Sequence, residues 1–318
     1  MDKIICVVGP TASGKTGLAV ELARQLDGEV LSCDSMQLYR HMDIGTATPT
    51  KEEMRGVPHH MISVVDPSED FSVGRYVEMA DPILQDILRR GKTAVICGGT
   101  GLYADSLLSG RTFAPCPSTG RREELEKMAD EQGIEAVLSY LRSFDPDSAD
   151  RLHPSDRRRI IRAAEVYLET GKTITQHNEE TKKIPPKYQA AWIGLDFLDR
   201  ADLYRRIDRR VELMMDDGLL EEIRALLALG VPSGATSLQA IGYKEPLAAL
   251  RGELTMDEAV ARIQQESRRY AKRQLTWFRR NSAIHWIRQP AEPVFSDTLR
   301  DAMTYLAACG FQTAEPSP

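Results

Sequence analysis

The sequence has few features that would place it outside a reducing compartment. Its five cysteines are scattered along 318 residues and form no C-x-x-C pair. Because Cys6, Cys33 and Cys97 lie in apolar, strand-like stretches, we interpret the cysteines as buried small side chains and not as disulfides or zinc ligands. No run of about 18 apolar residues is present, so no membrane-spanning helix is expected. The N-terminus shows no basic-then-apolar leader, and we expect a cytoplasmic protein without a signal peptide.

The charge is uneven along the chain. The net charge of −6 disfavours a nucleic-acid partner at first sight. However, the stretch Arg151–Arg162 contains five arginines and one acidic residue, and the stretch Arg262–Arg280 contains seven basic residues and one acidic residue. Local basic patches attract polyanions whatever the total charge. Each run is equally compatible with a solvated helix face, so both interpretations stay open at this point.

A glycine loop near the N-terminus is the strongest motif. Residues 9–16 read G-P-T-A-S-G-K-T, the phosphate-loop pattern G-x-x-x-x-G-K-[ST]. The loop follows an apolar stretch, Lys3–Val8, that predicts a buried strand, and it precedes a helical pattern that Gly28 is expected to end. Backbone N–H groups and the helix dipole favour an anion here, and Mg²⁺ is the expected cofactor. The predicted phosphate-binding residues are Gly9, Thr11, Ala12, Ser13, Gly14, Lys15 and Thr16, with the Thr16 hydroxyl as the magnesium ligand.

The remaining patterns predict an α/β fold with an insertion. The expected strands are Lys3–Val8, Glu29–Cys33, Thr93–Cys97, Ala190–Leu195 and Ala283–Ile287. Helical patterns separate the first three, which favours a parallel sheet with helices on both faces, like that of phosphate-loop NTPases. A proline-rich linker at 114–117 then precedes the helical stretches Arg121–Gln132, Ile134–Ser143 and Arg157–Thr170. We therefore expect a core at 1–112 and 187–318, a helical insertion domain at 113–186 and a loose tail at 313–318.

The usual magnesium aspartate of phosphate-loop enzymes is missing from its expected place. That residue ends an apolar strand in enzymes that act on ATP or GTP. Here the strand Thr93–Cys97 leads into Gly98-Gly99-Thr100-Gly101, and Asp34 follows a different strand. Asp34 is compatible with a ligand site at the carboxyl edge of the sheet or with an ordinary loop aspartate. The small residues Gly98–Gly101 indicate a plain turn or a close approach of the backbone to a ligand.

Several motifs together resemble the tRNA dimethylallyltransferase (tRNA isopentenyltransferase) family in its bacterial form. They are the phosphate loop, 34–37 with its continuation 39–47, 98–103, 157–165, 241–245 and 270–278. The similarity keeps the family's order from Lys3 to Arg280. The zinc finger of some eukaryotic members is absent, and roughly the last 30 residues resemble no motif that we can name.

The resemblance implies a reaction and three catalytic residues. A dimethylallyl group would pass from dimethylallyl diphosphate to N6 of adenosine 37, next to the tRNA anticodon. Asp34 would be the general base, and Thr100 would contact the substrate beside it. Arg210 would bind the pyrophosphate, with Arg206 as the neighbouring possibility, while the phosphate loop stabilises the leaving group. A solvated helix face is the other interpretation of these two arginines.

The resemblance also implies an RNA surface. The residues expected to contact the tRNA anticodon stem-loop are Asp34, Ser35, Met36, Gln37, Thr100, Arg157, Arg158, Arg159 and Arg162. Gln37 can read the Watson–Crick edge of an adenine that has left its stack. Arg158 and Arg162 are expected to share an outward face, and Arg268–Arg280 to line a channel of the core. We interpret Tyr270, Trp277 and Phe278 as core residues, because they recur at helical spacing.

Three other functions share part of this pattern. A small-molecule or nucleoside kinase has the same strand, loop and helix, and it would consume ATP. A transferase of the same family that acts on free adenine nucleotides should lack the helical insertion. A non-catalytic tRNA-binding module would not need a complete phosphate loop. No membrane and no obligate protein partner is expected.

Overall fold

The computed structural model describes residues 3–110, 113 and 119–312. The chain divides into two compact units, of which one contains the residues up to Leu108 and from Tyr188 onward. We call this unit the core, and we call the second unit, Ser109–Lys187, the insertion. The linker predicted at 114–117, residue 112 at the predicted boundary and the tail at 313–318 lie outside the described residues.

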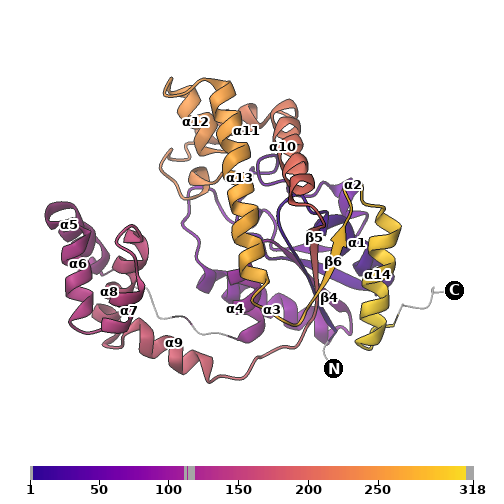
Figure 1. The fold of residues 1–318 in the computed structure, drawn as a ribbon, viewed down its shortest axis with the longest axis horizontal. Helices are drawn as coiled ribbons and strands as arrows, with labels where there is room; N and C mark the ends of the chain where they lie inside the picture. The colour runs from indigo at the N-terminus through magenta and orange to yellow at the C-terminus, as the bar shows by residue number, and fades with distance from the viewer. Residues whose placement is uncertain (1–2, 111–112, 114–118, 313–318) are drawn as a thin grey trace. The chain divides into compact units, whose positions relative to one another are not determined.

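A parallel sheet forms the centre of the core (Figure 1). Within the described part of the chain it has six strands in the order β3-β2-β4-β1-β5-β6, and all neighbours are parallel. The strands are β1 Ile4–Val8, β2 Gly28–Ser32, β3 His59–His60, β4 Thr93–Gly98, β5 Ala191–Phe197 and β6 Ile284–Gln289. The predicted parallel α/β fold is confirmed, and the five expected strands differ by two residues or fewer at either end. The sequence missed β3 because two residues show no period.

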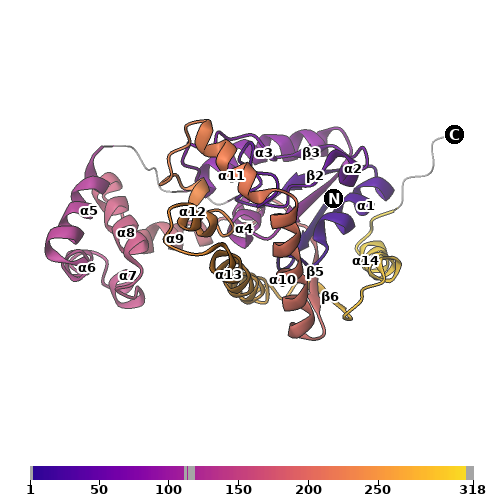
Figure 2. The ribbon, with the colours of Figure 1, turned by 90° about the horizontal axis from the view of Figure 1, so that it is seen from above.

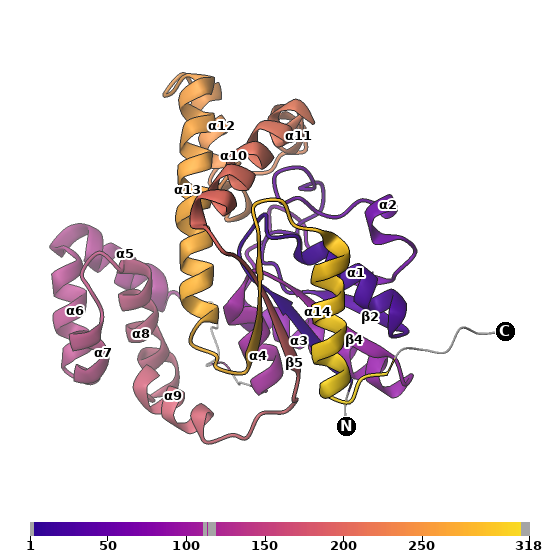
Figure 3. The ribbon, with the colours of Figure 1, turned by 45° about the vertical axis from the view of Figure 1, so that its right-hand side comes forward.

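Helices cover both faces of the sheet. In the core they are α1 Lys15–Gln25, α2 Lys51–Met54, α3 Val73–Arg89, α4 Gly101–Ser109, α10 Arg200–Asp216, α11 Leu219–Ala228, α12 Lys244–Leu250, α13 Met256–Phe278 and α14 Phe295–Ala308. Helices α1 and α14 lie side by side on one face (Figures 2 and 3). Alternate residues of β1 enter separate clusters, Ile5 with α1 and α14, and Cys6 with α3 and α4. This two-sided burial explains why the strands read as continuous apolar runs.

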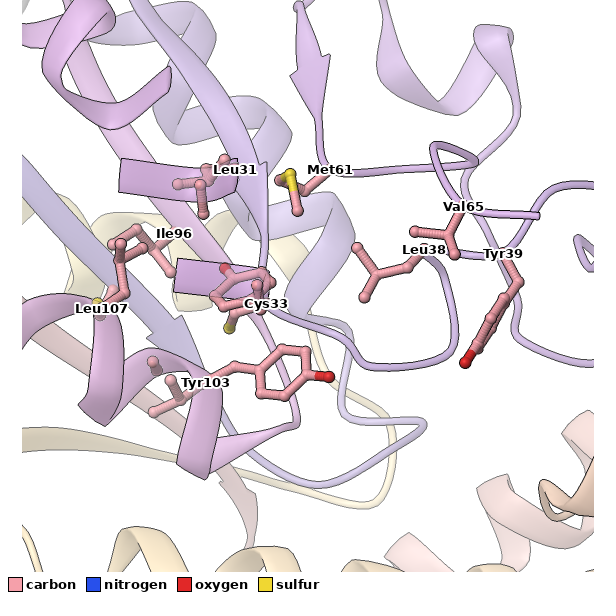
Figure 4. Close-up of a cluster of buried hydrophobic side chains, with 14 of the residues drawn as sticks. Leu31, Cys33, Leu38, Tyr39, Met61, Val65, Ile96, Tyr103 and Leu107 are labelled. Carbon is pink, nitrogen blue, oxygen red and sulfur yellow. The ribbon is translucent and has the colours of Figure 1, made fainter. Parts of the chain in front are cut away.

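The cluster on the α3 and α4 face also anchors the loop after β2. Figure 4 shows Leu31 of β2 and Ile96 of β4 beside Tyr103 and Leu107 of α4, with Leu38 and Tyr39 from the loop. Cys33 and Leu38 are fully buried. The short polar segment 34–37 is therefore held at both ends by core residues.

Helix boundaries in the core follow local signals with one exception. Gly28, the expected end of α1, instead opens β2, and α1 ends at Gln25 with Leu26 as its cap. On α10, Leu203, Ile207 and Val211 recur at helical spacing and form the buried face. In the part of the chain that the structure describes, no helix is both long and apolar enough to cross a membrane.

The insertion is entirely helical where it is described. Its helices are α5 Arg121–Gln132, α6 Ile134–Arg142, α7 Pro146–Arg151, α8 Arg157–Thr170 and α9 Ile174–Lys182. The three predicted helices are confirmed, and they enclose a separate apolar cluster around Val137, Ile160 and Ile161. The sequence missed α7, which is short, and α9, which is polar and begins at a capping box of Thr173.

Candidate active site

The phosphate loop joins β1 to α1 at the carboxyl edge of the sheet. Gly9 has φ of +143°, and a Cβ there would lie 2.5 Å from the carbonyl oxygen of Leu195 on β5. Gly14 caps α1 in a left-handed conformation without a side-chain hydrogen bond. The first N–H groups of α1 therefore have no side-chain cap and can bind an anion. Ser13, another small residue of the loop, is also buried, and it lines a cavity beside the loop.

Lys15 lies within this loop. Its Nζ donates a hydrogen bond to the carbonyl oxygen of Pro10, at 2.5 Å. Burial lowers the pKa of Lys15 to about 8, and the positive charge of Arg210 acts in the same direction. A diphosphate in the loop would oppose both effects, because an opposite charge favours the ammonium form.

Two arginines of α10 contact the phosphate loop. The guanidinium of Arg210 donates to the Thr11 hydroxyl at 3.3 Å, and Nε of Arg206 donates to the carbonyl oxygen of Ala12 at 3.1 Å. The guanidinium of Arg206 also lies over the ring of Phe197, 5.6 Å from its centroid. Burial lowers the pKa of Arg210, and the negative charge of Asp34 opposes that shift. The interpretation of these arginines as a merely solvated helix face is therefore wrong.

Two cavities meet beside Arg210. The larger, of about 1060 Å³, is lined by residues 12–17, 43–44 and 47–50 and by four arginines of α10, Arg205, Arg206, Arg209 and Arg210. The smaller, of about 320 Å³, contains Asp34, Thr11, Tyr270 and Arg273 in its walls. Arg210 and Met214 line both cavities. An anion at the phosphate loop would thus lie next to the space that Asp34 faces.

Asp34 and Thr100 come together because β2 and β4 are neighbours. The N–H of Cys33 donates to Cys97 at 2.8 Å, and the N–H of Thr100 donates to Cys33 at 3.2 Å. The Thr100 hydroxyl accepts the N–H of Ser35 at 3.1 Å. One carboxylate oxygen of Asp34 accepts the N–H of Met36 at 2.9 Å, which fixes the side chain in a local turn. Ser35 and Met36 line the smaller cavity as well.

Gln37 lies apart from these groups. Its Oε1 accepts the Ser32 hydroxyl at 3.0 Å, and its Nε2 donates to the carbonyl oxygen of Ala47 at 3.2 Å. Both ends of the amide are therefore engaged within the protein. Recognition of an adenine by Gln37 stays a prediction, and it would require these two hydrogen bonds to break.

The glycines at 98–101 serve the protein's own packing. A Cβ at Gly98 would lie 2.6 Å from the backbone of Cys33, and Cβ atoms at Gly99 and Gly101 would collide with Gln274 and Trp277. Contacts within the protein thus account for the missing Cβ atoms of these glycines, and a close approach to a ligand stays a prediction. The sequence alone cannot distinguish a glycine that makes room for a ligand from one that makes room for a side chain, because both require a residue without a Cβ.

The aromatic residues of α13 differ from one another. Phe278 is buried, which confirms a core role. Trp277 is half-buried, and its indole N–H donates to Asp105 at 2.8 Å. Tyr270 lines the smaller cavity, where the guanidinium of Arg273 lies 5.6 Å from its ring centroid. The core interpretation is wrong for Tyr270, because helical spacing also places a residue at the mouth of a cavity.

Much of the basic charge on α13 is paired within the core. Arg268 pairs with Asp208, Arg269 with Glu266 and Arg279 with Asp196. Among the basic residues that the structure describes in the run 268–280, Arg273 lines the cavity of Asp34. The expected channel wall is therefore much less cationic than the sequence indicates.

The insertion arginines separate into two groups. Arg157 pairs with Glu126 at 2.8 Å and with Asp130 at 2.7 Å. Arg162 pairs at 2.8 Å with Glu165, which is 2% exposed. Arg159 lies 3.6 Å from the carboxylate of Asp156 with its side chain 75% exposed, and Arg158 is also exposed. The expected outward face shared by Arg158 and Arg162 is wrong, since Arg162 neutralises a buried acid.

Glu222 is a positioning residue that the sequence did not reveal. Its carboxylate accepts the N–H groups of Asp43, Ile44 and Gly45 at 2.7, 2.8 and 3.2 Å, and the Tyr243 hydroxyl at 2.7 Å. These bonds hold the segment that lines both cavities. No local pattern could have identified it, because the partners are up to 179 residues apart in the chain.

Thr16, the predicted magnesium ligand, lies in the wall of the candidate site. Thr16 lines the larger cavity together with the carboxylates Asp43, Glu53 and Asp217. Among residues 3–110, 113 and 119–312, no cluster of three or more His, Cys, Asp or Glu side chains could hold a metal ion by itself. A magnesium ion at Thr16 would therefore depend on oxygens of the ligand, which is the usual arrangement at phosphate sites.

The sequence is similar to known protein families and to individual relatives over most of its length. The chain matches the family model described as IPP transferase over residues 37–281 and that described as isopentenyl transferase over residues 2–63. A tRNA dimethylallyltransferase of Acetivibrio thermocellus is 42% identical, over 98% of this chain and 99% of that protein. One of Bacillus cytotoxicus is 46% identical, over 90% of each chain.

Solved structures give the same result. A tRNA isopentenylpyrophosphate transferase from Bacillus halodurans has a TM-score of 0.73 and 40% identity, covering 97% of this chain and 96% of that one. A eukaryotic dimethylallyltransferase acting on tRNA has a TM-score of 0.80 and 28% identity, covering 98% and 81%. Given this coverage, together with the phosphate loop and the adjoining cavity of Asp34, the chain belongs to the IPP transferase family of tRNA dimethylallyltransferases and is a prenyl-transferring enzyme.

Proposed function

We propose that this enzyme transfers a dimethylallyl group from dimethylallyl diphosphate to N6 of adenosine 37 in tRNA. The observation that carries the proposal is the meeting of the two cavities at Arg210, with the phosphate loop on one side and Asp34 on the other. A diphosphate ester in the first cavity would present its reacting carbon to the second. The family membership weighs against a small-molecule kinase, which shares only the loop and its neighbouring elements.

On the donor side the protein supplies positive charge where negative charge develops. Lys15, Arg210 and the N–H groups at the start of α1 would bind the diphosphate. As the C–O bond to the diphosphate breaks, its electron pair leaves with the pyrophosphate, and these donors stabilise that charge. Mg²⁺ held by the Thr16 hydroxyl and the diphosphate oxygens would add to the neutralisation.

On the acceptor side the target amine needs a base. The lone pair of an exocyclic adenine amine is delocalised into the ring, so the amine is a weak nucleophile. As N6 bonds to the allylic carbon, Asp34 would accept one N6 proton. The base must leave its stack to enter the smaller cavity, where the ring of Tyr270 and the guanidinium of Arg273 offer flat surfaces for it.

One assay distinguishes this proposal from its rivals. The full chain is incubated with unmodified tRNA, dimethylallyl diphosphate, ATP and Mg²⁺, and a parallel reaction contains AMP in place of tRNA. Nucleosides from the digested tRNA are analysed by mass spectrometry, and the remaining ATP is measured. We expect a dimethylallyl adduct on adenosine 37 and no product with AMP in place of tRNA. Consumption of ATP without an adduct would indicate a kinase instead. Transfer to AMP alone would indicate an enzyme of free nucleotides.

The low pKa of Lys15 predicts a pH dependence of donor capture. Because that pKa is about 8 in the free enzyme, Lys15 loses its charge as the pH rises through this value. The kcat/KM for dimethylallyl diphosphate reports ionisations of the free enzyme, so it should fall above about pH 8. Bound diphosphate raises the pKa of Lys15, so kcat should change less over the same range.

The control is a Lys15→Arg variant, which keeps its charge, so its kcat/KM should not fall above about pH 8. Profiles of equal shape in both proteins would contradict the prediction.

The exposed arginines of the insertion predict a salt effect on RNA binding. Reversing Arg158 and Arg159 to Glu should weaken tRNA binding and flatten its salt dependence, since each lost phosphate contact lowers the slope of log affinity against log salt by about 0.7–0.9. Filter binding at several salt concentrations measures the slope. The matched control reverses Arg121 and Lys127, two exposed cations of α5. Equal slopes in the two double variants would remove Arg158 and Arg159 from the RNA surface.

A further inference from the structure

One buried side chain connects the phosphate loop to the segment that carries Thr100. Gln274 of α13 is 4% exposed. Its Oε1 accepts the N–H of Thr11 at 2.9 Å, and its Nε2 donates to the carbonyl oxygen of Gly99 at 3.0 Å. We propose that Gln274 is a positioning residue that sets the spacing between the donor loop and the acceptor segment. This inference rests on the proposed function.

The hydrogen bonds continue from Gln274 on both sides. The Thr11 hydroxyl accepts a bond from Arg210, so the same loop residue is held by α10 and by α13. On the other side Gly99 precedes Thr100, whose hydroxyl accepts the N–H of Ser35 next to Asp34. A single amide thus joins Thr11, whose hydroxyl accepts a hydrogen bond from Arg210, to Gly99, the residue before Thr100.

The amide of Gln274 satisfies both partners. The site requires one acceptor for an N–H group and one donor for a carbonyl oxygen. A carboxylate lacks the donor, and a thioether lacks the donor and is only a weak acceptor. The missing Cβ of Gly99 makes the contact possible, since a Cβ there would collide with Nε2 of Gln274.

A second buried glutamine provides a matched comparison. Gln289 of β6 is 5% exposed, and its Nε2 donates to the carbonyl oxygen of Ser13 at 2.9 Å. It therefore holds the same phosphate loop through an amide of the same type. This partner belongs to the donor loop, whereas Gln274 also bonds to the residue before Thr100.

The experiment compares Gln274→Met with Gln289→Met in the full enzyme. Single-turnover rates and kcat are measured with saturating tRNA and dimethylallyl diphosphate, and melting temperatures are recorded by circular dichroism. Gln274→Met should lower kcat about 100-fold, the scale expected for reacting groups displaced by about 1 Å. Gln289→Met should raise the KM for dimethylallyl diphosphate and leave kcat within about threefold, since it disturbs donor binding alone. Both should lose melting temperature, and Gln274→Met somewhat more, because it removes two buried hydrogen bonds and Gln289→Met removes one.

A second variant tests the same contact from the other side. Gly99→Ala keeps the glutamine and displaces its amide, so it should lower kcat in the same way as Gln274→Met. This variant also keeps the inference testable if Gln274→Met does not fold. Equal effects of the two glutamine variants on kcat, or a Gln274→Met effect confined to the donor KM, would overturn the proposed positioning role. Failure of the wild-type enzyme to modify tRNA would instead overturn the proposed function.

Discussion

Asp34→Asn is expected to lower the single-turnover rate of prenyl transfer by about 10²–10⁴-fold, the contribution typical of a general base. The amide oxygen of the substituted side chain can still accept the N–H of Met36, so the local turn is preserved. Affinities for tRNA and for dimethylallyl diphosphate should therefore stay within a few-fold of the wild type. Rapid-quench kinetics with enzyme in excess over tRNA measure the rate, and titrations measure the affinities.

Asp66 supplies the matched control for this substitution. One of its carboxylate oxygens accepts the N–H of Ser68 at 2.9 Å, in the same two-residue turn that Asp34 makes with Met36. Asp66 lines neither of the two cavities. Asp66→Asn should keep the wild-type rate of transfer. A wild-type rate in Asp34→Asn would show that Asp34 is not the base, and equal losses in both variants would point to the turn.

Arg210→Met should have the second largest effect, lowering the rate of transfer about 10²–10³-fold, as for loss of one donor to a developing anion. Arg210 is the more enclosed of the two loop-binding arginines, and it lines both cavities. Its charge should therefore stabilise the departing pyrophosphate more than the bound donor, so kcat should fall as well as affinity. Arg206→Met should act mainly on the KM for dimethylallyl diphosphate, because Arg206 is exposed.

Arg200 provides the comparison on the same helix. It is exposed and lines neither of the two cavities. Arg200→Met should change kcat by no more than a few-fold. Steady-state kinetics of the three variants at saturating tRNA separate the roles. If Arg206→Met reduces kcat more than Arg210→Met does, the assignment of the two arginines is reversed.

Local patterns were enough to predict the framework of this protein. The strands of a parallel sheet are buried on both faces, so they stand out as apolar runs, and the phosphate loop carries its glycines at fixed spacing. The insertion helices α5, α6 and α8 were visible for a similar reason, because their apolar residues recur at the helical period. Both signals arise between residues that are close in the sequence.

The tertiary structure alone decided what the individual side chains do. Arg157 and Arg158 are neighbours in one basic run, yet only the fold brings Glu126 of α5, 31 residues away in the chain, to Arg157. Gln274 had no feature of its own beyond its place in a long motif, and its partners Thr11 and Gly99 lie 263 and 175 residues away in the chain. The physical reason is common to these cases. Hydrogen bonds and ion pairs act over a few ångströms in space, so a residue's role depends on partners that the packing of distant segments brings to it.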